Sequence, residues 1–161
     1  MGLATFKGGI HPYEGKELSE NKPVLELLPK GELVFPMAQH IGAPAKPLVK
    51  KGDRVLAGQM IGEAGGFISA NVLCSVSGTV KAVEPRLMVN GQMVTSVIVE
   101  NDGLYETIPH FGEERDYTKL SKEEIRGIVK EAGIVGLGGA GFPTHVKLTP
   151  KDESKIDYIL V

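Results

Sequence analysis

Short apolar runs separated by turn residues dominate the chain between residues 32 and 100. The runs are about five residues long and turn signals recur roughly every ten residues, which indicates a β-sandwich or a small barrel. Asn90-Gly91 is the strongest hairpin signal among them. Pro36 interrupts the run ELVFPM and favours an edge strand, because proline has no N–H to donate to a neighbour. Further strands are predicted around residues 72–76, 79–83 and 94–100.

Two turns are predicted on either side of Val55, at Lys51-Gly52-Asp53 and at Ala57-Gly58-Gln59. The Asp53 carboxylate can accept a hydrogen bond from the backbone of its own turn, as Asp commonly does in such positions. Val55 is expected to point inward.

One helix is predicted in LSKEEIRGIVKEAG. Ser121 is a good N-cap, and Glu124, three residues later, completes a capping box. Gly133 suits the position just after the helix. Four apolar residues recur at helical spacing on one face: Ile125, Ile128, Val129 and Ala132. We interpret this helix as a packing element.

The segments outside the β region are less regular. The first 30 residues form either an arm or a strap laid across a domain, and Phe6, Ile10 and Pro12 favour the strap. The final residues, KIDYILV, are expected to form a buried apolar strand. The predicted organisation is a strap at 1–30, a sandwich at 31–104, a linker at 105–120 and the start of another domain at 121–161.

Composition excludes several classes. The 161 residues include 18 basic and 20 acidic side chains, a net charge of −2, which argues against a dedicated nucleic-acid surface. No apolar run is long enough to span a membrane. Cys74 is the only cysteine, so no disulfide forms within the chain and no iron–sulfur cluster is held by it alone. Cys74 is interpreted as a small buried apolar residue, and a reducing cytosol as the default compartment.

The histidines show no metal-ligand spacing and are interpreted as surface or turn residues: His11, His40, His110 and His145. His40 stands out because it lies where the sandwich could meet a partner. No metal ligand and no catalytic residue is assigned.

The stretch GIVGLGGAGFPTHVKL, residues 133–148, carries the candidate chemistry. Gly136, Gly138 and Gly141 spell G-x-G-x-x-G, but a dinucleotide-binding fingerprint must follow a strand and open a helix. Here a helix precedes it and Pro143 follows, and no Gly-Lys-Ser/Thr follows for a phosphate-binding P-loop. The glycines still allow backbone N–H groups to approach a flat ring or a phosphate. A plain glycine-rich connection is the alternative.

The β region resembles the biotinyl and lipoyl carrier domains, which are barrel-sandwich hybrids made of two matching halves. Val49, Gly52-Asp53, Val55, Gly58-Gln59 and Ile61 fit their pattern, and SGTV at 77–80 fits the second half. Those carriers expose a lysine on the hairpin between the halves. The corresponding residues 63–71 contain none, so the scaffold is expected without the carrier chemistry.

The glycine stretch closely resembles a segment of the flavin-binding 51 kDa subunit of respiratory complex I, in which it lies against FMN and NADH. The matching positions are Gly136, Gly138, Gly139, Ala140, Gly141, Phe142, Pro143, Thr144 and Lys147. The match departs at Leu137, His145 and Leu148, where the family has Arg, Gly and Trp. The resemblance implies a mainly β barrel-sandwich hybrid followed by a helix and the start of an α/β flavin-binding domain.

The order of motifs over nearly the whole chain resembles the RnfC family, peripheral subunits of an ion-translocating NADH:ferredoxin oxidoreductase. The segments that support this resemblance are FKGGIHPYEGKELS, QHIGAPAKPLVKKGD and CSVSGTV, which precede the glycine stretch. The resemblance implies NADH oxidation through FMN and two 4Fe-4S clusters held in a C-terminal region that this chain lacks, so an N-terminal fragment is expected. It also implies partners among the membrane-embedded and ferredoxin-side Rnf subunits, indirect contact with ferredoxin, and a peripheral place on the cytoplasmic side of the cell membrane.

The residues expected to bind the cofactor are Gly136, Gly138, Gly139, Gly141, Phe142 and Lys147. The glycines would give close backbone approach, Phe142 would pack against NADH, and Lys147 would place a cation near the flavin. Two alternatives remain. One is a non-catalytic, carrier-like docking domain, and the other is the A subunit of a sodium-pumping NADH:quinone reductase, which GGIHP fits less well.

Overall fold

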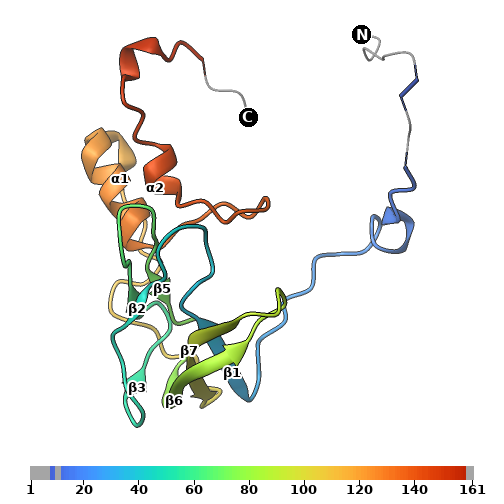
Figure 1. The fold of residues 1–161 in the computed structure, drawn as a ribbon, viewed down its shortest axis with the longest axis vertical. Helices are drawn as coiled ribbons and strands as arrows, with labels where there is room; N and C mark the ends of the chain where they lie inside the picture. The colour runs from blue at the N-terminus through green and yellow to red at the C-terminus, as the bar shows by residue number, and fades with distance from the viewer. Residues whose placement is uncertain (1–7, 10–11, 159–161) are drawn as a thin grey trace.

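Two antiparallel sheets share one hydrophobic core in the computed structural model, which describes residues 8–9 and 12–158 (Figure 1). The four-stranded sheet has the order β1 (Glu32–Pro36), β7 (Met93–Asn101), β6 (Gly78–Leu87) and β3 (Arg54–Val55). The three-stranded sheet has the order β2 (Lys46–Pro47), β4 (Met60–Glu63) and β5 (Val72–Leu73). The predicted barrel-sandwich class is confirmed.

The longest pairing in the molecule is the β6–β7 hairpin, which runs from Gly78 opposite Asn101 to Leu87 opposite Met93. Gly91 closes it with φ +78°, and its N–H donates to the Met88 carbonyl at 2.9 Å. The Asn90-Gly91 hairpin is therefore confirmed. β6 extends past the predicted end at residue 83 because β7 continues to pair with it. β1 lies at the sheet edge, as Pro36 predicts.

The core lies between the two sheets. Val55 is fully buried, as expected. The Asp53 carboxylate accepts a hydrogen bond from Lys50 N–H at 3.0 Å, and Gln59 N–H donates to the Leu56 carbonyl at 3.1 Å, so both predicted turns are confirmed. β5 is shorter than predicted because the Cys74 backbone pairs with the turn at Gly58 and Gln59 instead. The buried cluster comprises Phe35, Met37, Ala45, Val55, Ile61, Val72, Cys74, Val76, Val80, Val97 and Val99.

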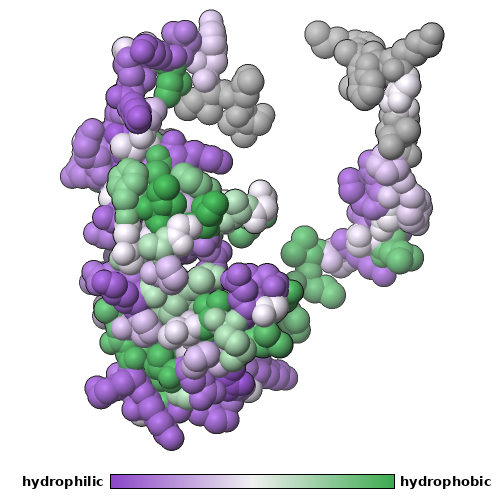
Figure 2. Space-filling model, viewed as in Figure 1, coloured by the Kyte–Doolittle hydropathy of each residue, from purple (hydrophilic) through white to green (hydrophobic). Residues whose placement is uncertain are grey.

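Residues 12–28 extend away from the sandwich, with one short 3-10 turn, η1 (Lys16–Leu18) (Figure 1). Val24 is 101% exposed, and Leu25 and Leu27 are also exposed, so an apolar stretch faces solvent (Figure 2). The expectation of a strap across the domain is wrong for these residues, because no described element covers their side chains. Phe6 and Ile10 lie outside the described residues.

The helical end begins after a 3-10 turn, η2 (Tyr117–Lys119), with α1 (Lys122–Glu131). The capping box is confirmed: Ser121 Oγ accepts from Glu124 N–H at 3.2 Å, and the Glu124 carboxylate accepts from Ser121 N–H at 2.8 Å. The predicted apolar face is only partly covered. Ile128 and Val129 are half-buried, whereas Ile125 and Ala132 are exposed. No helix in the described ranges has the length and apolar character that a membrane span requires.

Beyond α1 the chain forms α2 (Thr144–Lys147) and η3 (Glu153–Lys155). Glu153 pairs with Lys122 and Arg126, which ties η3 back to α1. The predicted terminal strand is wrong for residues 156–158, which are exposed and irregular, because no described strand is available to pair with them. The rest of that predicted strand lies outside the described residues.

Candidate functional site

The glycine loop, defined as residues 136–142, is closed at its base by backbone hydrogen bonds. Gly136 N–H donates to the Phe142 carbonyl at 3.0 Å, and Thr144 N–H donates to the Ile134 carbonyl at 3.0 Å. Val135 and Pro143 form an isolated antiparallel bridge between these two bonds. The loop is therefore a narrow, hairpin-like projection from the helical end (Figure 1).

The four glycines of this loop have two different roles. A Cβ added to Gly138 or Gly139 would meet no atom within 4 Å, and Gly139 has φ +104°. A Cβ on Gly141 (φ +59°) would lie 2.9 Å from the Gln39 carbonyl oxygen. Gly136 is at the base, where an added Cβ would make only ordinary contacts. Gly141 is thus required by the chain's own packing, whereas the tip at Gly138 and Gly139 leaves its backbone open to a ligand.

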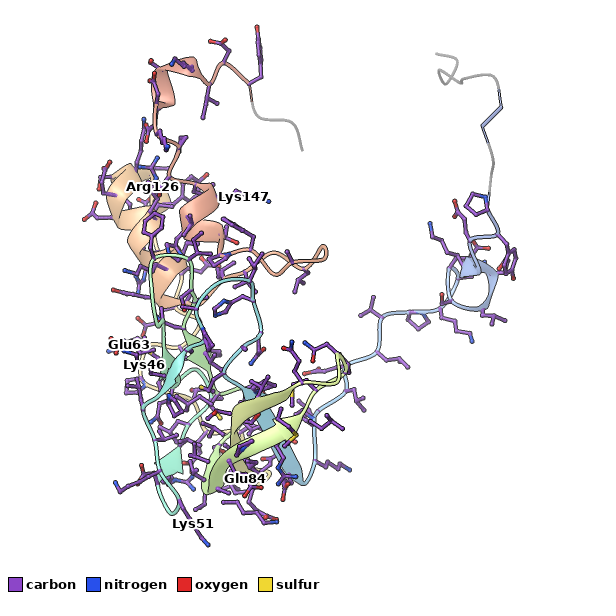
Figure 3. The ribbon with its side chains drawn as sticks, in the orientation of Figure 1. Lys46, Lys51, Glu63, Glu84, Arg126 and Lys147 are labelled. Carbon is purple, nitrogen blue, oxygen red and sulfur yellow. The ribbon has the colours of Figure 1, made fainter. Side chains whose placement is uncertain are left out.

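Phe142 and Lys147 flank this tip on its C-terminal side. Phe142 is half-buried at the base of the loop. Lys147 is exposed on α2, forms no ion pair with the described residues, and extends toward the side on which the glycine loop projects (Figure 3). Its ammonium group is therefore available to an anionic ligand. His145 is half-buried, and burial, with Lys130 as the second cause, lowers the pKa of its imidazole.

The sandwich holds the glycine loop through residues 39–42. Ile41 N–H donates to the Ala140 carbonyl at 3.0 Å. His40 lies in the same segment, and its Nε2 accepts from Ala70 N–H at 3.1 Å. Because a backbone N–H can only donate, Nε2 is unprotonated, and Nδ1–H is left to donate to the Ile41 carbonyl at 3.1 Å.

His40 thus has a structural partner on the sandwich, and the remaining described histidines form no metal site. His110 Nδ1 lies 2.7 Å from the Glu113 carboxylate on the exposed linker. Within residues 8–9 and 12–158, no cluster of three or more His, Cys, Asp or Glu side chains could hold a metal ion. Cys74 is buried, as expected, and this burial raises the pKa of its thiol.

Asn71 is a residue that sequence reasoning missed. Its Nδ2 donates to the carbonyls of Lys130 and Glu131 at the end of α1, each at 3.3 Å, and its Oδ1 accepts from Ala64 N–H at 2.9 Å. Gly133 packs against it: an added Cβ there would lie 2.3 Å from the Asn71 carbonyl oxygen. The only sequence signal was the expected left-handed glycine after the helix, which does not identify its neighbour.

A partly open pocket of about 350 Å³ lies at the junction of this part of the sandwich with the helical end. Gln39, His40 and Asn71 line it from the sandwich, and Ala132 and Gly133 from the end of α1. The junction therefore combines this pocket with direct contacts, namely the Asn71 hydrogen bonds and the packing of Gly133 against Asn71.

Two family models match the chain. The RnfC barrel sandwich hybrid domain matches residues 4–104, and the Nuo51 FMN-binding domain matches residues 129–161. The second match includes the whole glycine loop and Lys147.

Curated relatives match almost the whole chain. It is 48% identical over 158 residues to the C subunit of the Na(+)-translocating ferredoxin:NAD(+) oxidoreductase complex of Acetobacterium woodii, covering 98% of the chain and 35% of the relative. It is 41% identical over 160 residues to the C subunit of the proton-translocating ferredoxin:NAD(+) oxidoreductase complex of Clostridium ljungdahlii, covering 99% and 35%. The C subunit of the ion-translocating oxidoreductase complex of Vibrio cholerae is 35% identical over 151 residues, covering 91% and 19%. The chain thus spans about a third of the length of the first two.

Proposed function

The chain belongs to the RnfC family through its barrel sandwich hybrid domain, and from this premise we propose that it is the N-terminal part of a subunit that oxidises NADH through FMN. The intact subunit would act in an ion-translocating NADH:ferredoxin oxidoreductase. The curated relatives, named as the C subunits of such complexes, support this assignment.

The open tip of the glycine loop is the observation that carries the proposal. Gly138 and Gly139 present backbone with no atom within 4 Å of an added Cβ, and this tip lies inside the match to an FMN-binding domain. A side chain at either position would occupy the space that a flat isoalloxazine ring needs. The residues present therefore fit the cofactor.

The chain's own residues would bind and orient FMN. Backbone N–H groups at the tip would approach the ring or phosphate, Lys147 would place a positive charge beside it, and Phe142 would pack against the nucleotide substrate. FMN, when bound, supplies the chemistry that accepts a hydride from NADH and passes on single electrons. The loop's part is to position the cofactor, because the protein supplies binding and electrostatics to such reactions.

The remaining parts of the proposal lie outside this chain. Two 4Fe-4S clusters would receive the electrons from FMN, held by cysteines in the C-terminal region of the intact subunit. The other Rnf subunits would be the partners, with ferredoxin reached indirectly. The intact protein would sit peripherally on the cytoplasmic side of the membrane.

The test is FMN binding to the intact subunit, measured by fluorescence titration after removal of flavin. We expect wild type to bind FMN and Gly138→Ala to bind it at least tenfold more weakly. Gly127→Ala is the matched control, because Gly127 also has open space around an added Cβ and an ordinary φ, but lies in α1. Failure of the wild-type protein to bind FMN would contradict the proposed function.

Lys147 is tested separately by Lys147→Ala. Lys51→Ala is the control, because Lys51 is also exposed but lies at the opposite end of the molecule (Figure 3). Weaker FMN binding in the Lys147 variant alone is expected. Equal FMN affinity and equal reduction by NADH in both variants would remove Lys147 from the site.

A further inference from the structure

We propose that the tip of the sandwich, defined as residues 39–42 and 63–71, positions the glycine loop for flavin, with Asn71 and His40 as the positioning residues. The proposal rests on the function proposed above and adds residues from the other domain to it. In carrier domains the corresponding hairpin presents a lysine to a partner, whereas residues 63–71 contain no lysine and contact the helical end instead.

Asn71 connects the two parts of the chain through its side-chain amide. Its Oδ1 bond to Ala64 N–H stays within the sandwich, and its two Nδ2 bonds reach the carbonyls of Lys130 and Glu131 in α1. The last carbonyls of a helix lack partners within the helix. The Lys130 carbonyl also accepts from Gly133 N–H at 3.1 Å, and the Asn71 amide adds a donor from the sandwich to it and to the Glu131 carbonyl. Asn71 therefore fixes the end of α1, from which the chain continues through Gly133 into the glycine loop.

His40 makes the second connection rigid. Its Nε2 accepts from Ala70 N–H in the other tip segment, and its Nδ1–H donates to the carbonyl of the neighbouring Ile41, which fixes the ring. The Ala70 bond, together with the bond from Ala43 N–H to the Ile68 carbonyl, holds residues 39–42 against residues 63–71. The same segment supports the loop directly, because Ile41 N–H bonds the Ala140 carbonyl. The sandwich therefore contacts the glycine loop in two ways. Ile41 bonds Ala140 within the loop, and Asn71 bonds the end of α1, the helix that precedes the loop.

These bonds support the loop together with the close packing of Gly141 against the Gln39 backbone. A pocket lies beside His40, Asn71 and Gly133, so side chains fill only part of the junction. The tip of the glycine loop is exposed, with Leu137 at 99%. Within the described chain, the backbone hydrogen bond that holds the loop beyond its own base is the one from Ile41 N–H to the Ala140 carbonyl. Small displacements of a cofactor-binding group weaken binding strongly, so loss of these contacts should lower the affinity for FMN.

Asn71→Asp separates the positioning role from a role within the sandwich. The aspartate keeps an oxygen for Ala64 N–H but cannot donate to the α1 carbonyls, and its charge lies at the negative end of the helix dipole. Asn101→Asp is the matched control. The aspartate at position 101 also keeps the oxygen that accepts from Gly103 N–H, and it loses the N–H that donates to the Pro29 carbonyl. Both bonds lie away from the junction.

Both variants are made in the intact subunit, and two quantities are measured. One is FMN affinity, and the other is amide hydrogen exchange of residues 133–148 in the FMN-free protein. We expect Asn71→Asp to weaken FMN binding about tenfold and to speed exchange in this segment, and Asn101→Asp to change neither. Asn71→Ala, which introduces no charge, should behave like Asn71→Asp.

His40→Ala is compared with His110→Ala in the same two measurements, and only the first should weaken FMN binding and speed exchange. Wild-type affinity and exchange in Asn71→Asp, or equal effects in Asn101→Asp, would overturn the positioning role. Absence of FMN binding in the wild type would contradict the proposed function instead, so the two failures are distinguishable.

Discussion

Gly141→Ala is expected to loosen the contact between the glycine loop and the sandwich. Gly141 has φ +59°, and an added Cβ would lie 2.9 Å from the Gln39 carbonyl oxygen and 3.2 Å from His40 Cα. A non-glycine residue in the left-handed region costs about 1–2 kcal/mol. The backbone of residues 39–40 must also move, which lengthens the neighbouring bond between Ile41 N–H and the Ala140 carbonyl and costs about 0.5–1 kcal/mol.

Together these effects lower the free energy of opening this contact by about 2 kcal/mol, which corresponds to roughly 30-fold faster amide exchange at Ile41. The assay is hydrogen exchange at the Ile41 amide, followed by NMR. Gly138→Ala is the control, because its added Cβ meets no atom within 4 Å. Unchanged Ile41 exchange in Gly141→Ala, or equal acceleration in both variants, would refute the reasoning.

Two further predictions concern a buried hydroxyl in the sandwich and an ion pair in the helical end. Ser77 is fully buried, donates to the Asp102 carboxylate at 2.7 Å and accepts from Glu106 N–H at 2.9 Å. Ser77→Ala should therefore lower the free energy of unfolding, measured by urea denaturation, by about 1–3 kcal/mol. A loss below about 0.5 kcal/mol would contradict this prediction. Glu153 has its pKa lowered from 4.5 to about 2, chiefly by its hydrogen bond with Lys122. Because the folded pKa is depressed, its stabilisation is present above pH 4.5 and is lost as the pH falls toward 2. An NMR titration of the Glu153 carboxyl that gives the ordinary value would contradict this.

The local elements of this fold could be predicted because their signals are local. Asn90-Gly91 sets the β6–β7 hairpin, the Ser121–Glu124 capping box sets the start of α1, and Asp53 closes its own turn. Each depends on residues only a few positions apart, so the sequence displays them directly.

The missed features depend on long-range packing. Nothing near Asn71 in the sequence indicates that its amide bonds α1, about 60 residues later. The glycine loop looked uniform in sequence, yet Gly141 is needed for contact with Gln39 and Gly138 is not. The two failed expectations, the strap and the terminal strand, both assumed that apolar side chains are buried against other parts of the same chain.

The most direct test of the account is an experimental structure of the intact subunit with FMN bound. We expect the isoalloxazine ring in van der Waals contact, within about 4 Å, with the backbone of Gly138 and Gly139. A ring seated elsewhere, with residues 136–142 only connecting α1 to α2, would contradict it.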